Sequence, residues 1–138
     1  MRKYLPYIVL LVPLILAFSC KRSEFRRDGT PRQAAIVMDS MSADFGTFPK
    51  SAGVQRTVFT FKNEGDADLE FQVVDPSCGC VKVEYPQTPV KPGKKGEIVA
   101  FFNGKYKKPG KVYYKIYVEC SGEPDHFVLR LGGYMTEK

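Results

Sequence analysis

The fold class of this chain is best indicated by the stretch Val112-Tyr113-Tyr114-Lys115-Ile116-Tyr117-Val118-Glu119-Cys120. Along it, every second residue belongs to one face, and the residues between them belong to the other. Successive side chains of an extended strand point to opposite faces, so a period of two is typical of a half-buried β-strand. One face would carry Val112, Tyr114, Ile116, Val118 and Cys120. The stretch therefore predicts a long strand that lays one face on a hydrophobic core.

The same alternation recurs in four other stretches of the chain. Their expected core faces are Thr57, Phe59 and Phe61; Leu69, Phe71 and Val73; Ile98, Ala100 and Phe102; and Phe127, Leu129 and Leu131. Residues 97–102 are largely apolar on both faces, which predicts a strand in the middle of a sheet.

Turn-forming residues separate these stretches at 63–66, 92–94, 108–110 and 121–124. We expect Gly65 to adopt positive φ and Pro92-Gly93 to form a type II turn. Short strands at this spacing, without any long helical period after the N-terminal segment, predict an all-β fold: an Ig-like β-sandwich of about seven antiparallel strands. The chain has no Trp, so it lacks the Cys…Trp…Cys framework of antibody domains.

Length and composition agree with one globular domain. The chain has 138 residues, of which 43% are hydrophobic and 26% charged. The formal net charge is +6, and the basic residues are spread over several segments. Because no basic patch or stripe stands out, we expect no nucleic-acid partner.

The first 19 residues predict export from a bacterial cytoplasm. Arg2 and Lys3 precede an apolar run at 4–18, and the small Ser19 follows it, which is the order of a secretory signal. The run is shorter than the roughly 20 residues that a membrane span needs. A membrane-spanning anchor is therefore the weaker alternative.

The segment before Cys20, Leu16-Ala17-Phe18-Ser19, resembles the lipobox of bacterial lipoproteins, although Ala17 and Phe18 depart from its usual pattern. The resemblance implies a lipid on Cys20 that attaches the chain to a membrane of the cell envelope. The outer membrane is favoured because no acidic residue directly follows the cysteine. The alternative is a cysteine beside an ordinary cleavage site. We assign residues 1–19 to a signal peptide, 20–34 to a lipid-anchored tether and 35–138 to the sandwich domain.

Several motifs occur in a characteristic order within residues 44–132. They are Asp44-Phe45-Gly46-Thr47-Phe48, Phe59-Thr60-Phe61-Lys62-Asn63-Glu64-Gly65-Asp66, Ser77-Cys78-Gly79-Cys80, Pro89-Val90-Lys91-Pro92-Gly93 and Leu129-Arg130-Leu131-Gly132. This order resembles a bacterial family of unknown function with an Ig-like fold related to the major-sperm-protein class. The resemblance implies an exported, often lipid-anchored protein without an assigned activity. One departure is Glu119-Cys120-Ser121, where relatives often have Ser-Asn.

Three cysteines remain after Cys20, namely Cys78, Cys80 and Cys120. An odd number permits at most one internal bridge. Closing Cys120 onto Cys78 or Cys80 would form a loop of about 40 residues, but periodicity puts Cys120 on an inner face and Cys80 on an outer one. A Cys78–Cys80 bridge requires a sharp bend at Gly79. All three pairings stay open, and Cys120 is expected to be a buried thiol.

Cys78-Gly79-Cys80 is also the only motif that suggests chemistry. It is either a structural turn or a redox couple or soft-metal site for Cu(I) or Zn. No nucleophile–base pair and no phosphate-binding loop is evident, so we expect no enzymatic activity, no cofactor and no resident metal. A binding or scaffold module for an envelope protein or glycan is the leading hypothesis, with a periplasmic thiol-redox or copper-handling protein as the alternative.

The outward face of residues 112–120 holds a candidate partner surface. Tyr113, Lys115 and Tyr117 lie on it together. Exposed aromatic side chains of this kind mark either a surface for a protein or glycan partner or a cross-strand ladder that covers the sheet.

Overall fold

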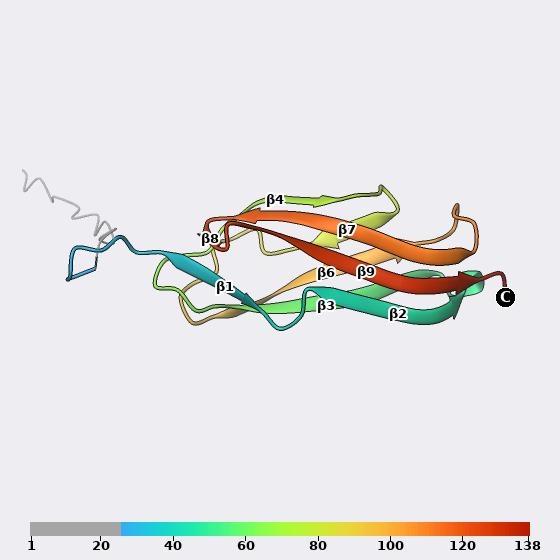
Figure 1. Ribbon diagram of the computed structural model, residues 1–138, viewed down its shortest axis with the longest axis horizontal. Helices are drawn as coiled ribbons and strands as arrows, with labels where there is room; N and C mark the ends of the chain where they lie inside the picture. The colour runs from blue at the N-terminus through green and yellow to red at the C-terminus, as the bar shows by residue number, and fades with distance from the viewer. Residues whose placement is uncertain (1–25) are drawn as a thin grey trace, which may run out of the picture.

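The computed structural model describes residues 26–138 and forms two β-sheets packed face to face (Figure 1). This confirms the predicted Ig-like β-sandwich. The expected signal peptide and Cys20 lie outside the described residues.

The first sheet has the strand order β5-β6-β3-β1-β8. Its strands are β1 (Ala34–Met38), β3 (Val54–Asn63), β5 (Val81–Glu84), β6 (Lys95–Asn103) and the two-residue β8 (Gly122–Glu123). Strand β6 pairs with β5 on one side and β3 on the other, which confirms its expected place inside a sheet.

The second sheet has the order β2-β9-β7-β4. Its strands are β2 (Ser42–Pro49), β4 (Phe71–Pro76), β7 (Gly110–Cys120) and β9 (His126–Thr136), and a short 3-10 turn, η1 (Lys50–Ala52), follows β2. The described residues thus form nine strands rather than about seven. Two pairings, β2 with β9 and β1 with β8, are parallel, so the expectation of purely antiparallel strands was wrong at these edges.

The core lies between the sheets and holds the faces that alternation predicts. Phe59, Phe61 and Phe102 are fully buried, and the rings of Phe45, Phe48 and Tyr114 pack around Phe102. Leu69 is also fully buried, but it lies outside β4 and forms an isolated bridge with Val90.

Strand β4 departs from the predicted alternation. The register with β7 shifts between Phe71 and Val73, which marks a bulge. Because a bulge inserts one extra residue, every later side chain moves to the other face. Val73 is therefore 40% exposed, and Val74 packs against the core in its place.

The turn at 63–66 is held by contacts that the sequence does not reveal. Gly65 does not adopt positive φ, so that expectation was wrong. A Cβ at Gly65 would instead lie 2.3 Å from the carbonyl oxygen of Gln33 and 2.4 Å from the amide of Ala35. The glycine is needed because β1 passes close to its backbone. Gly93 does take positive φ, and the amide of Lys94 bonds to the carbonyl of Lys91, as a type II turn at Pro92-Gly93 requires.

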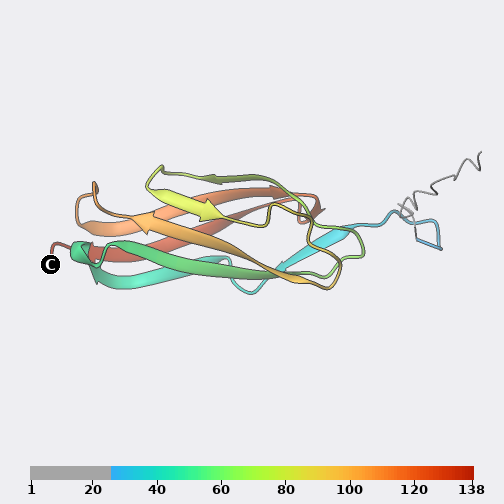
Figure 2. The same ribbon diagram turned by 180° about the vertical axis from the view of Figure 1, so that it is seen from behind.

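The described part of the expected tether contacts the domain. Arg26 donates a hydrogen bond to Asp66, and the amide of Gln33 donates to the same carboxylate at 2.9 Å. Ala34, the last residue assigned to the tether, is the first residue of β1 and is 2% exposed. Figures 1 and 2 show that the C-terminus lies at the opposite end of the sandwich from the start of β1.

Candidate functional site

Cys78 and Cys80 form a disulfide in the turn between β4 and β5, with their Cα atoms 5.2 Å apart. The turn is fastened to both sheets. The amide of Ser77 donates to the carbonyl of Lys115 on β7 at 2.8 Å, and the amide of Asn103 on β6 donates to the carbonyl of Cys80 at 2.8 Å. The disulfide therefore lies on a well-held surface turn where the chain passes from one sheet to the other.

Cys120 takes no part in this bridge. It is 2% exposed at the end of β7, with its Sγ 3.5 Å from the carbonyl oxygen of Pro124. Burial raises the pKa of this thiol, which keeps it protonated. A buried, protonated thiol is a poor nucleophile, so its place in the structure agrees with a core residue.

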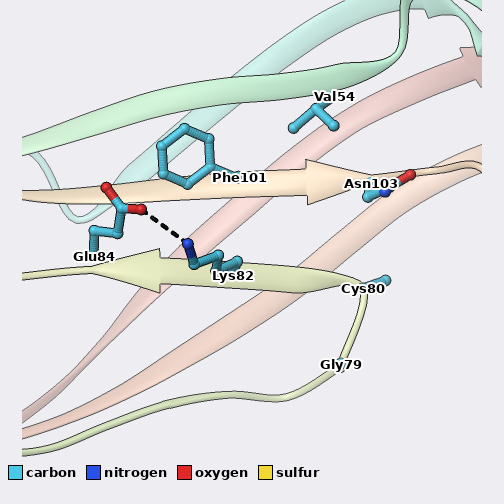
Figure 3. A pocket seen from close by; sticks show the side chains of 7 residues that line it. All are labelled: Val54, Gly79, Cys80, Lys82, Glu84, Phe101 and Asn103. Carbon is cyan, nitrogen blue, oxygen red and sulfur yellow. Dashed lines mark hydrogen bonds and ion pairs between the residues drawn. The ribbon is translucent and has the colours of Figure 1, made fainter.

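A pocket of about 370 Å³ lies next to the disulfide, on the outer face of the first sheet (Figure 3). Phe101 lies against it from β6 and Val54 from β3, while Cys80 borders it at the turn. Lys82 and Glu84 form an ion pair of 3.0 Å along β5 at its edge. The pocket thus combines apolar groups with one neutralised pair of charges. The alternation of residues 97–102, apolar on both faces, is the sequence signal for it.

The predicted partner surface is on the outer face of β7. Tyr113 is 52% exposed and Tyr117 is 46% exposed, and Lys115 lies between them with less exposure. Tyr113 lies opposite Gly132 on β9, and Tyr117 lies opposite Val128. These partners carry no ring, so the two tyrosines do not form an aromatic cross-strand ladder.

A groove of about 380 Å³ occupies the same face, between β2, β9 and β7. In one row across the sheet, Gly132 lies between Asp44 and Tyr113. In the next row, Tyr134, which is 53% exposed, lies between Thr47 and Lys111. Apart from Tyr113, the residues of this groove cannot be recognised from the sequence. They come from three separate segments that only strand pairing brings together.

Residues 26–138 contain no group of three or more His, Cys, Asp or Glu side chains placed to hold a metal ion. In the same part of the chain, no helix has the length and apolar character that a membrane crossing requires.

Solved structures with a similar fold come from distant proteins. One is a protein of unknown function from Porphyromonas gingivalis W83, with a TM-score of 0.66 and 13% identity over 75% of this chain and 47% of that one. This chain therefore spans about half the length of that protein. Another is the PapD-like domain 7 of human CEP192, with a TM-score of 0.60 and 14% identity over 77% of this chain and 88% of that one.

The periplasmic chaperone SfaE is also similar, with a TM-score of 0.50 and 8% identity over 75% of this chain and 58% of that one. Identities this low show a shared fold alone. No curated protein matches the chain. A family model does match, over residues 36–135, and it spans most of the sandwich. The chain therefore belongs to the family described as "Protein of unknown function (DUF1573)".

Proposed function

We propose that this chain is a non-enzymatic binding module of the bacterial cell envelope, attached to a membrane through a lipid on Cys20. The observation that carries the binding role is the outer face of β7 and β9, where Tyr113, Tyr117 and Tyr134 are each about half exposed. Exposed tyrosines are common in recognition surfaces, because each ring offers a large rigid contact with a polar end.

The shape of the molecule supports this arrangement. The described chain enters the sandwich at the start of β1, while Tyr134 is close to the C-terminal end of β9 (Figure 1). An anchor preceding β1 would leave the far end of the sandwich directed away from the membrane. The fold shared with a periplasmic chaperone is compatible with a binding role in that compartment.

Site-specific photo-crosslinking in cells tests the proposed surface. A photoreactive amino acid at position 113 or 117 should give a defined adduct with an envelope component. The same group at Tyr106, which is 88% exposed and lies between β6 and β7, is the matched control and should give none. Equal crosslinking at all three positions, or none at 113 and 117, would contradict the proposal.

Attachment through Cys20 has its own test. The chain should incorporate a labelled fatty acid and sediment with membranes. Cys20→Ser should abolish both, because the acyl chains that anchor the protein are attached to this cysteine. If Cys20→Ser still sediments with membranes, a membrane-spanning N-terminal segment is the better explanation.

A second candidate function rests on the disulfide. Cys78 and Cys80 are bridged in a turn between two strands, and Cys80 borders the pocket at Phe101. In such a redox role, a dithiol partner would give two electrons and two protons to the bridge and become a disulfide itself. Incubation with a dithiol protein should then leave Cys78 and Cys80 reduced. A bridge that persists after such incubation would exclude this role, and Cu(I) competition on the reduced protein tests copper handling.

A further inference from the structure

We propose that the groove over Gly132 binds an acidic saccharide, namely a sugar ring that carries a carboxylate. This inference rests on the proposed function, since it names the ligand class for one part of the tyrosine face. It concerns the residues in register across β2, β9 and β7: Asp44, Thr47, Lys111, Tyr113, Gly132 and Tyr134.

The groove is open at Gly132 because glycine has no side chain. Its neighbours in the row are Asp44 and Tyr113, and the next outward residue of β9 is Tyr134. A Cβ at Gly132 would meet other atoms only at 3.8 Å and beyond, and no positive φ requires glycine there. Because neither strain nor crowding demands this glycine, its effect is to leave room for a ligand beside Tyr113 and Tyr134, next to Asp44. A sugar ring has one apolar face of C–H groups, which suits contact with such rings.

Polar groups at the rim suit the substituents of a sugar. One carboxylate oxygen of Asp44 accepts a hydrogen bond from the amide of Gly46 at 2.7 Å, which fixes the side chain. Within residues 26–138, the other oxygen has no hydrogen-bond partner and faces the groove beside Gly132. It can accept a hydrogen bond from a sugar hydroxyl, as the few placed polar groups of a small-molecule site do.

The balance of charge favours an acidic ligand. Lys111 borders the groove, and Lys115 lies opposite Arg130 in the adjoining row. None of these three cations forms an ion pair within the described chain, whereas Asp44 is the only carboxylate that borders the groove. Such an excess of positive charge attracts a carboxylate and makes its binding sensitive to salt.

An extended peptide is a poorer fit to this position. Strands β7 and β9 each pair with neighbours on both sides, so their main-chain groups are already used in the sheet. A peptide that adds to a sheet needs a free edge. The groove lies on the outer face of the sheet, where the side chains of Asp44, Tyr113 and Tyr134 offer the contacts that a saccharide uses.

Calorimetric titration of the full-length chain in detergent micelles tests the inference, with a galacturonic acid hexamer as the probe and a neutral glucose hexamer as its control. We expect binding of the acidic hexamer that weakens on added salt. Gly132→Val, which fills the groove, should weaken binding by about tenfold or more, and Tyr113→Ala should do the same. Tyr106→Ala is the matched control and should bind as the unmodified chain does.

The outcomes separate the two proposals. If Gly132→Val binds the acidic hexamer as the unmodified chain does, the groove is not the binding site. If both hexamers bind equally, the ligand is not selected by its charge. If neither hexamer binds while crosslinking at position 113 yields a protein adduct, the saccharide inference fails and the binding role stands. Thermal unfolding of Gly132→Val close to that of the unmodified chain ensures that lost binding is not lost folding.

Discussion

The side-chain oxygen Oδ1 of Asn63 accepts a hydrogen bond from the amide of Gly65 at 3.0 Å, and this contact is part of a buried network at the end of β3. The same oxygen accepts the amide of Ala35 at 3.3 Å. Its Nδ2 donates to the carbonyls of Ala67 and Val90 at 2.8 and 2.9 Å. Asn63 therefore joins β1, β3 and two turns through one side chain.

Asn63→Ala should destabilise the fold strongly. Asn63 is fully buried, so its removal leaves buried backbone groups without partners. We expect a loss of about 2 to 3 kcal/mol in the free energy of unfolding. Urea unfolding measures this loss. Asn103→Ala is the control, because that side chain is exposed and accepts one bond from the amide of Lys105; it should change stability by less than about 0.5 kcal/mol. Equal effects of the two variants would contradict the network.

Gly65→Ala should disturb the start of β1. The added Cβ would lie 2.3 Å from a backbone oxygen, which no rotamer change relieves. We expect a loss of about 1 to 3 kcal/mol, together with faster hydrogen exchange of the amides in β1. Gly79→Ala serves as the comparison, since nothing lies within 4 Å of its Cβ and its φ is not positive. A stable Gly65→Ala variant would show that β1 moves freely there.

The alternation of residues predicts which faces are buried wherever pairing is regular. Residues 112–120 and 98–102 follow the prediction because β7 and β6 are regular and lie inside their sheets. Val73 does not follow it, because a bulge in β4 is set by pairing with β7 and leaves no clear mark in the local sequence. The role of Gly65 is likewise not visible in the local sequence, because the close approach of β1 to it depends on tertiary packing.

The candidate sites also differ in how far the sequence predicts them. Tyr113 and Tyr117 are visible in the sequence as outward residues of one strand. The groove beside Tyr113 is not, because Asp44 and Gly132 become neighbours only through the parallel pairing of β2 with β9. The three possible disulfides could not be ranked from spacing alone, since the turn at Cys78 is defined by its bonds to β6 and β7.

The carboxyl group of Asp66 should titrate far below its usual range. The hydrogen bond from Arg26, and then the bond from the amide of Gln33, lower the pKa of Asp66 from 3.8 to about 2. Because the pKa is lower in the folded state, this contact stabilises fully above pH 3.8 and is lost as the pH falls toward about 2.

Carbon-detected NMR of the Asp66 carboxyl measures this midpoint directly. Arg26→Gln should raise the pKa of Asp66 toward 3.8, since the leading cause of the shift is removed. A midpoint near 3.8 in the unmodified chain would show that residues 26–33 do not dock on the turn in solution.

The three cysteines of the domain should differ in reactivity, and tryptic mapping separates them. Cleavage after lysine and arginine places Cys78 and Cys80 together in residues 63–82 and Cys120 in residues 116–130. Without reductant, the first peptide should lack two hydrogens, because its cysteines are bridged to each other.

Alkylation of the folded protein should leave Cys120 unmodified, because the thiol is buried and its raised pKa keeps it protonated. After mild reduction, Cys78 and Cys80 should both react while Cys120 stays protected until the domain unfolds. The variant Cys120→Ala is the control, and it should leave the bridge in place. A covalent link between the two peptides would contradict this pairing, because it would place Cys120 in the disulfide and leave one thiol of the turn free.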